Sequence, residues 1–224
     1  IAFLIRESPR RIEVRNATVP EVREFPLSEV EVIVWISVAV IFCCNCMSVP
    51  IVHLVPLLTD VGQSVEYATS VLLALMLAGG VGRIMAGKIG DIIGALPAYM
   101  IMSAGQTLSA FMFPHVGPGV ALYLLAMFFG FTYSGVMTSI LFSTRMMVSA
   151  RFSARSMSLT SFFGWNGMGM GGFFAGYLFD QTGDYDWSFA YASIAGAINL
   201  IVLSLFYIRI KTAKNKISTP SAAS

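Results

Sequence analysis

The stretch Gly80-Val-Gly82-Arg-Ile-Met-Ala86-Gly87-Lys-Ile-Gly-Asp91-Ile-Ile-Gly94 returns later in the chain as Gly169-Met-Gly171-Gly-Phe-Phe-Ala175-Gly176-Tyr-Leu-Phe-Asp180-Gln-Thr-Gly183. Six positions are identical in the two copies, and each recurs at the same offset of 89 residues, from Gly80 to Gly169. Each copy is a glycine-rich apolar run that ends in an aspartate and, three residues later, a glycine. Self-similarity at a fixed spacing indicates an internally duplicated fold.

The composition is that of a membrane protein. Apolar residues make up 56% and charged residues 12% of the 224 residues, and the mean hydropathy is +0.75. These values are far from those of a soluble domain. Six apolar stretches each approach the roughly 20 residues that a helix needs to cross the hydrocarbon. They cover residues 32–58, 66–86, 96–113, 118–143, 157–179 and 187–208. The sequence therefore predicts an all-α membrane protein with six transmembrane helices over residues 30–210.

The presence of lysine and arginine alternates from one predicted connection to the next. They occur before the first helix, in the second and fourth connections, and after the sixth helix, whereas the first, third and fifth connections contain none. The cations are Arg6, Arg10, Arg11, Arg15, Arg23, Lys88, Arg145, Arg151, Arg155, Arg209, Lys211, Lys214 and Lys216. Because cytoplasmic loops carry the excess of cations, both ends of this segment are predicted to be cytoplasmic. Asp91 then faces the cytoplasm and Asp180 the exterior, so that the two copies form two inverted three-helix repeats.

The two ends of the chain have linker chemistry. Residues 1–29 begin without an initiator methionine, and they are interpreted as the end of a preceding helix followed by a basic cytoplasmic linker. They lack the order of basic, apolar and small residues that a signal peptide requires. Residues 211–224, with their Thr, Ser, Ala and Pro, are predicted to form a disordered cytoplasmic tail. The chain is therefore interpreted as a piece of a larger multi-pass protein of the cell membrane.

Several motifs resemble one known family. The charged linker, the six helices and the stretch from Gly87 to Gly94 resemble the C-terminal half of a major facilitator superfamily transporter. His53-Leu-Val-Pro56, Gly82-Arg83, and Ala175 to Tyr185 followed by Phe189 are similar to the monocarboxylate transporter branch, including the bacterial oxalate/formate antiporter. The likeness covers roughly residues 30–210. It implies a twelve-helix fold of which this chain supplies one half.

The resemblance also implies a function. It is secondary active transport of a small organic anion, expected to be a monocarboxylate, by alternating access. The implied partners are the missing N-terminal six-helix half, the lipid bilayer, and a coupled proton or counter-anion. No covalent chemistry, cofactor, metal or nucleic acid is expected, and the protein is not predicted to be an enzyme.

Arg83 is the first candidate for binding the anion. It lies in an apolar stretch, one turn before the expected cytoplasmic end, where an arginine side chain can extend to the membrane interface. Alternatively, it faces a water-filled cavity, because a charge left in lipid is costly and normally marks an ion or substrate path. Its planar guanidinium suits a carboxylate. By resemblance, an arginine in this helix binds the substrate carboxylate.

Two departures from the family pattern restrict the analogy. Animal monocarboxylate transporters resemble one another in an aspartate one turn before this arginine, where the coupled proton is handled, and here Gly79 stands there. The oxalate antiporter has a second cation in a later helix, and Trp165-Asn166-Gly-Met168 offers none. A substrate with a single negative charge is therefore favoured over a dicarboxylate.

The first copy of the repeat has two interpretations. In one, residues 87–94 form a tight loop whose glycines have positive φ and in which Asp91 caps the next helix. In the other, small residues allow helices to approach closely while Asp91 bonds across them when the cytoplasmic side is shut. The family pattern has a basic residue directly after the aspartate, where this chain has Ile92. The predicted gating residues are Gly87, Lys88, Asp91, Gly94 and Asp180.

Five further residues are candidates for lining the substrate cavity: His53, Asn45, Tyr133, Trp165 and Asn166. His53 either binds a carbonyl freed by a nearby proline or serves as a cavity-lining donor or proton carrier. Asn45 is expected to be buried against another helix or the cavity, since an amide facing lipid is costly. Tyr133, Trp165 and Asn166 form a polar and aromatic belt that either packs helices together or orients an organic anion.

Three other classes of function remain open. The first is a transporter-like sensor or receptor that binds an organic anion without moving it. The second is a membrane enzyme or redox protein that uses Cys43, Cys44 and Cys46, although three thiols within one helical turn and without a nearby histidine or acid suit packing better than a metal site. The third is a self-sufficient six-helix protein that dimerises. Gly167 to Gly172 resembles a dinucleotide loop only in its letters, because no strand precedes it.

Overall fold

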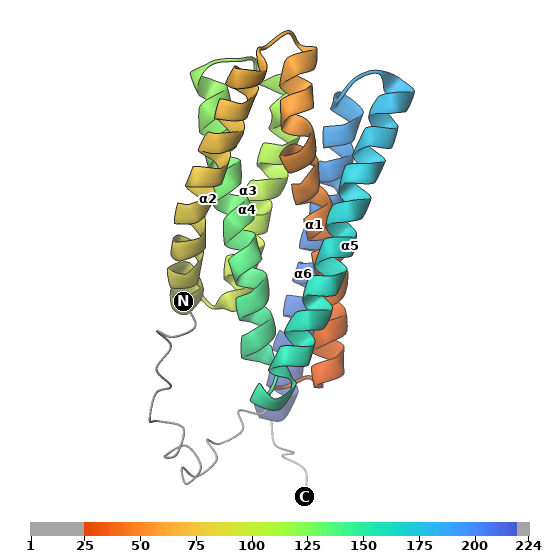
Figure 1. Cartoon of the computed structure of the whole chain (residues 1–224). Helices are drawn as coiled ribbons and strands as arrows, with labels where there is room; N and C mark the ends of the chain where they lie inside the picture. Colours follow the sequence, from red (N-terminus) through yellow and green to blue (C-terminus); the bar gives the residue numbers. More distant parts are fainter. Residues whose placement is uncertain (1–24, 219–224) are drawn as a thin grey trace, which may run out of the picture.

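The computed structural model describes residues 25–218, which form six α-helices and one short 3-10 turn and contain no strand. The predicted linker up to residue 24 and the tail from residue 219 lie outside the described residues. The elements are α1 (Glu29–Asp60), α2 (Val65–Ile93), α3 (Ala95–Met112), η4 (Phe113–His115), α4 (Val120–Met147), α5 (Ala150–Thr182) and α6 (Asp186–Ser218). The all-helical prediction is confirmed (Figure 1). One part of the predicted tail is wrong, since residues 211–218 continue α6 with good helix formers such as Ala213 and Lys214.

The helices run alternately up and down the bundle. The connections near residues 62, 117 and 184 lie at one end, the top in Figure 1, and those near residues 94 and 148 lie at the other end. α1, α2, α4 and α6 are long and apolar enough to cross a membrane. α3 and α5 are not in this group, because α3 carries Gln106 with several hydroxyl residues and α5 is rich in glycine.

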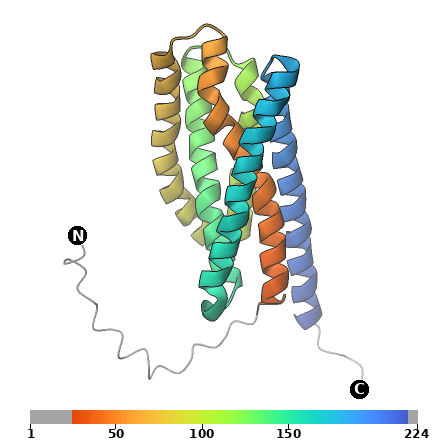
Figure 2. The same cartoon turned by 45° about the vertical axis from the view of Figure 1, so that its right-hand side comes forward.

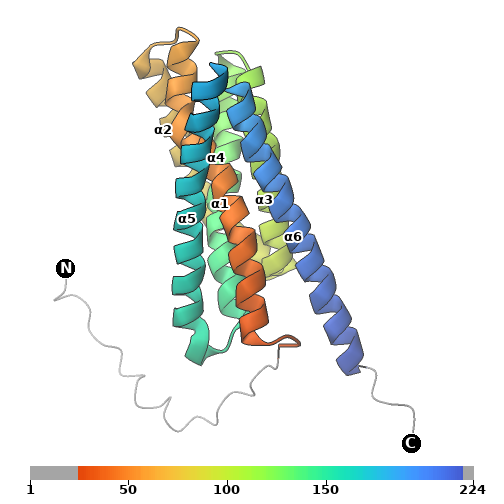
Figure 3. The same cartoon turned by 90° about the vertical axis from the view of Figure 1, so that its right-hand side faces the viewer.

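The helices pack in two groups. α1 packs mainly on α5 and α6, α4 packs mainly on α2 and α3, and contact between α3 and α6 joins the groups. Figure 2 shows α2 beside α4, and Figure 3 shows α1 between α5 and α6. α1 is the most enclosed of the helices that can span a membrane, and every residue from Cys43 to Pro50 is buried.

Glycines of the repeated motif bring helix backbones into close contact. A Cβ atom added to Gly82 of α2 would lie 2.1 Å from the carbonyl oxygen of Phe131 in α4. A Cβ added to Gly171 of α5 would lie 2.3 Å from the carbonyl oxygen of Asn45 in α1. Only glycine permits backbones to approach this closely. The second glycine of each copy therefore fixes one helix crossing.

The remaining repeated positions also have matching environments. Ala86 and Ala175 are both buried, and Asp91 and Asp180 are both exposed in the last turns of their helices. Gly94 ends α2 with φ +97°, and Gly183 ends α5 with φ +74°. Both glycines adopt backbone angles that other residues rarely tolerate.

The loop interpretation of residues 87–94 is wrong. α2 continues as a helix through Gly87 and Asp91 to Ile93, and only Gly94 has positive φ. Gly94 itself occupies the N-cap position of α3, where no side chain donates or accepts a capping hydrogen bond. Asp91 therefore does not cap α3. The glycines of this stretch therefore do not end the helix before Gly94, contrary to what their spacing in the sequence indicated.

The two crossings can be tested with paired substitutions. We expect Gly82→Ala and Gly171→Ala each to reduce the free energy of unfolding by about 1–3 kcal/mol, because an added methyl overpacks the contact with the facing backbone. Gly80→Ala and Gly169→Ala are matched controls, since an added Cβ at either site meets no described atom within 4 Å. Thermal unfolding of the detergent-purified protein measures all four. Equal unfolding midpoints for a variant and its control would contradict the assigned crossings.

Candidate functional site

Arg83 lies on the exposed side of α2, far from either end of the helix. α2 ends at Ile93, ten residues and about 15 Å beyond Arg83, so the helix extends past the apolar stretch that was predicted to end at residue 86. Within residues 25–218, no hydrogen bond or ion pair joins Arg83 to another residue. The guanidinium is therefore available to a partner from outside this segment.

The backbone next to Arg83 is held by the contact between α2 and α4. Its neighbour Gly82 touches Phe131, and a Cβ added to Gly79 would lie 2.5 Å from the hydroxyl oxygen of Ser134. Gly130 of α4 approaches α2 equally closely, at the carbonyl of Leu75. The close α2–α4 contact therefore fixes the position of the Arg83 backbone.

Tyr133 lies in α4 close to this crossing. Its half-buried ring stacks on Phe129, with the ring centroids 5.9 Å apart. The neighbouring Thr132 hydroxyl donates to the carbonyl of Phe128 at 2.9 Å, inside its own helix. Thr132 therefore has the role of a packing residue, whereas Tyr133 keeps a partly exposed phenol.

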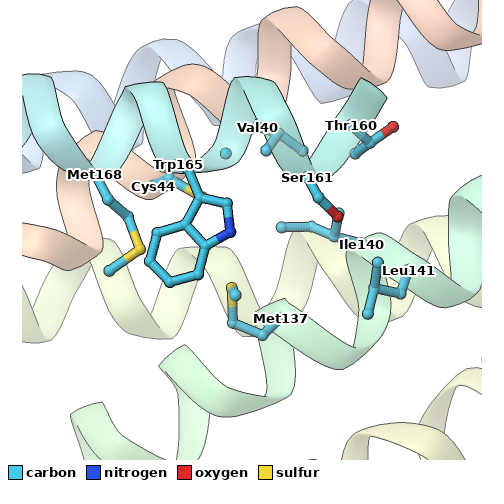
Figure 4. A pocket seen from close by; sticks show the side chains of 10 residues that line it. Val40, Cys44, Met137, Ile140, Leu141, Thr160, Ser161, Trp165 and Met168 are labelled. Atoms are coloured by element: carbon cyan, nitrogen blue, oxygen red, sulfur yellow. The ribbon is translucent and has the colours of Figure 1, made fainter. Parts of the chain in front are cut away.

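Trp165 lines a cavity between α1, α4 and α5 (Figure 4). The cavity has a volume of about 80 Å³. Trp165 extends from α5 toward Met137 of α4, and 71% of its surface is exposed. Its lining residues are Val40, Cys44, Met137, Ile140, Leu141, Thr160, Ser161, Gly164, Trp165 and Met168.

The two candidate asparagines differ in environment. Asn45 is buried, as expected, with 3% of its surface exposed, and its backbone touches Gly171. Its side-chain oxygen has no hydrogen-bond partner in the described part of the chain. Asn166 is exposed next to Trp165, and its side-chain nitrogen donates to the carbonyl of Phe162 at 2.8 Å. Asn45 thus belongs to the α1–α5 contact, while Asn166 lies on an open face of α5.

His53 bridges α1 and α5. Its Nε2 lies 3.1 Å from the carbonyl oxygen of Gly172, so the predicted bond to a proline-freed carbonyl of its own helix is wrong. The ring of Tyr185, in the connection between α5 and α6, lies 5.8 Å away between centroids. Burial, followed by the nearby carboxylates of Asp60 and Asp180, raises the pKa of Tyr185. His53 and Asp180 therefore belong to one group at the top of the bundle.

The predicted gating residues Lys88 and Asp91 are exposed at the opposite end. No ion pair between residues 25 and 218 involves either of them. An ion pair at this end instead joins Arg209 of α6 to Glu31 of α1, with Nε and Oε1 2.9 Å apart. The charges of the proposed gate thus have no partner within the described segment.

The structure brings some candidates together and keeps others apart. Arg83 and Tyr133 lie on α2 and α4, which pack closely on each other, while Trp165 and Asn166 lie on α5, which packs mainly on α1. Phe131, at the Arg83 crossing, and Met137, in the cavity wall, are six residues apart on α4, which corresponds to about 9 Å. α4 therefore borders both the charged position and the cavity, although no hydrogen bond or ion pair joins Arg83 to the other candidates in residues 25–218.

Sequence reasoning missed a buried polar network between α3 and α6. The Tyr99 hydroxyl donates to Asn199 Oδ1 at 3.2 Å, and Asn199 Nδ2 donates to the Ser103 hydroxyl at 2.6 Å. Gln106 Nε2 donates to the carbonyl of Cys43 at 3.1 Å, which joins α3 to α1. Both Gln106 and Asn199 are amides in apolar segments. Because an amide that faces lipid is costly, their presence there could have predicted buried hydrogen-bonding positions.

Asn199→Ala tests this network. It leaves the buried hydroxyls of Tyr99 and Ser103 without their partner, and we expect a loss of about 1–3 kcal/mol in the free energy of unfolding. Ser204→Ala, one turn and a residue further along α6, removes only a bond within the helix and is the control. Thermal unfolding in detergent compares the two variants. If both unfold at the same temperature, the network has no stabilising role.

Comparison with known proteins identifies a family and a relative. The family model described as Major Facilitator Superfamily matches residues 34–223. Monocarboxylate transporter 13 of Rattus norvegicus is 31% identical over 166 residues, which cover 71% of this chain and 38% of that relative. The chain thus spans less than half the length of the relative. The match includes every described helix, although it begins inside α1.

Proposed function

The chain belongs to the Major Facilitator Superfamily, and from this premise we propose that it is one half of a secondary active transporter for a small organic monoanion. Family membership and the helices that can span a membrane make it an integral, multi-pass membrane protein. They point to a transporter rather than an enzyme. An N-terminal six-helix half supplies the other wall of the proposed transport path.

The two triplets α1–α3 and α4–α6 are proposed to be inverted repeats. Exchanging the triplets turns the packing of α1 on α5 into that of α4 on α2. It likewise turns the contact of Gly171 with Asn45 into one that corresponds to Gly82 with Phe131. The copies end at Gly94, after α2, and at Gly183, after α5, and the connections that follow these two helices lie at opposite ends of the bundle (Figure 1). This correspondence supports alternating access, in which the repeats open the path first to one side and then to the other.

Arg83 carries the proposal for the substrate. A guanidinium in the interior of an apolar helix, exposed and without a counter-ion in residues 25–218, is suited to an anion in a water-filled path. A single cation favours a single negative charge, and guanidinium geometry favours a carboxylate. The similarity to a rat monocarboxylate transporter supports a monocarboxylate.

The other predicted residues have assigned roles in this proposal. Those that line or border the path are His53, Asn45, Tyr133, Trp165 and Asn166. The cytoplasmic gate comprises Gly87, Lys88, Asp91 and Gly94, and Asp180 contributes to the outer gate beside Tyr185. Partners for these charges come from the N-terminal half. We place the protein in the cell membrane with both ends of this segment cytoplasmic, coupled to a proton or a counter-anion.

Transport is tested with the full-length protein in proteoliposomes. Uptake of labelled lactate, pyruvate or formate, above that of empty liposomes, is the expected result. Saturable binding of these acids without uptake would contradict transport and support a sensor that binds an organic anion. Serine in place of Cys43, Cys44 and Cys46 is expected to leave uptake intact, because the proposal assigns no redox or metal-binding role to these free thiols.

Arg83→Lys tests the anion anchor. Lysine retains the charge but loses the paired donors of guanidinium, and a charge-assisted hydrogen bond is worth about 1.5–3 kcal/mol, so we expect uptake to fall about 10- to 100-fold. Arg209→Lys is the control, since lysine there can still pair with Glu31. Size-exclusion profiles of both variants establish that they fold. Normal uptake by Arg83→Lys would make Arg83 an interfacial anchor instead.

A further inference from the structure

α6 is longer than a membrane crossing requires. It runs for 33 residues, from Asp186 to Ser218, which corresponds to about 50 Å, whereas the hydrocarbon core of a bilayer is about 30 Å thick. The far end of α6 also continues past the start of α1 (Figures 2 and 3). A substantial part of this helix therefore lies outside the hydrocarbon.

Exposed side chains mark the part of α6 that fits the hydrocarbon. Trp187 and Tyr207 are both exposed, and they lie 20 residues, or about 30 Å, apart along the helix. Between them, Ile194, Ile201 and Leu205 are exposed at spacings that place them on one face. Tryptophan and tyrosine are enriched at the two membrane–water interfaces. The hydrocarbon layer thus fits the segment from Trp187 to Tyr207, and the rest of α6 lies beyond it.

Every charged residue of the described helix beyond Tyr207 is basic. Arg209 pairs with Glu31 of α1, with Nε and Oε1 2.9 Å apart. The Lys211 ammonium lies 5.9 Å from the centre of the Tyr207 ring, a cation–π contact at the edge of the apolar segment. All the cations of this segment are exposed: Arg209, Lys211, Lys214 and Lys216.

The acids at the start of α1 already have other partners. The Glu29 carboxylate accepts a hydrogen bond from the backbone N–H of Ser149 at 2.9 Å, and the Glu31 carboxylate accepts one from Arg209. In the part of the chain that the structure describes, no lysine of α6 forms an ion pair. The three lysine charges are therefore open to a partner outside this segment.

The depth of these lysines matches the headgroup layer. Lys211 lies four residues, or about 6 Å, beyond Tyr207, and Lys216 lies nine residues, or about 13 Å, beyond it. The polar layer on each side of the hydrocarbon is about 5–8 Å thick. Because lysine side chains extend along apolar surfaces toward an interface, all three ammonium groups reach this layer. A continuous helix holds them there, in contrast to the disordered tail that the sequence predicted.

We propose that residues 209–216 form a docking surface for anionic phospholipid headgroups of the cytoplasmic leaflet. The inference goes beyond the proposed transport function and uses only its orientation, with both ends of this segment cytoplasmic. The cytoplasmic leaflet carries negative charge, and each lysine near such a surface strengthens binding about fivefold. The charge of the surface and the charge of the leaflet are complementary, whereas a zwitterionic headgroup offers no net charge.

The experiment measures lipid binding to the full-length protein. The protein is purified in detergent and titrated with phosphatidylserine or phosphatidylcholine, and native mass spectrometry counts the bound lipids. We expect phosphatidylserine to bind about tenfold more tightly or better, with a preference that falls as salt is added. Lys211→Gln, Lys214→Gln and Lys216→Gln together are expected to remove most of this preference.

Two further variants separate the helix from total charge. Arginine at the same three positions keeps the charge and is expected to retain the preference. Arg145→Gln, Arg151→Gln and Arg155→Gln together remove the same number of exposed cations from the α4–α5 end, and most of the preference is expected to remain. Size-exclusion profiles establish that each variant folds. Equal losses in the two glutamine variants would show that binding follows total charge and would overturn the docking surface.

The remaining outcomes are equally decisive. Equal binding of the two lipids by the parent protein would overturn the proposal. If the lysine-to-glutamine variant then also unfolded at a lower temperature in detergent, the lysines would instead pair with an acidic protein segment. A preference for phosphatidylserine without uptake of any labelled acid would support the docking surface and overturn transport, and uptake without the preference would do the reverse.

Discussion

Two places where helix backbones touch determine the rest of this structure. Gly82 brings α2 against the backbone of Phe131 in α4, and Gly171 brings α5 against the backbone of Asn45 in α1. Inside a bilayer the hydrophobic effect does not hold helices together, so close packing through small residues has to do so. Each contact joins a helix of one triplet to a helix of the other. The bundle is therefore held by crossings between the triplets more than by contacts within them.

The proposed site depends on these crossings. Arg83 follows Gly82 directly, so its position beside α4 is set by the first contact. The second contact seats α5 on α1 and leaves the cavity beside Trp165 between α5 and α4. His53 adds a bond from α1 to the α5 carbonyl of Gly172 near the top of the bundle. The charged position thus lies on α2 beside α4, and the apolar cavity lies between α1, α4 and α5.

Much of the fold was predictable from the sequence, and the limits have physical causes. The apolar stretches predicted six helices because length and hydropathy are properties of each segment alone. The end of α2 was misjudged, since Gly87 resembles a loop residue in sequence but has helical angles, and only Gly94 needs positive φ. Hydrogen-bond partners in other helices were harder to predict from the sequence. The bond from His53 to Gly172 and the Tyr99–Asn199 pair join residues about 100 positions apart, which a single sequence does not reveal.

The central claim is that the two triplets are related by inversion across the membrane. It is tested by replacing Asp91 or Asp180 with cysteine in the full-length protein lacking its other cysteines, and by labelling with an impermeant maleimide. Both positions are exposed, so each thiol is open to the reagent. The inverted arrangement predicts that intact cells label the cysteine at position 180 and that the one at position 91 reacts only after permeabilisation. Labelling of both positions from the same side would contradict the inverted repeat and the alternating access derived from it.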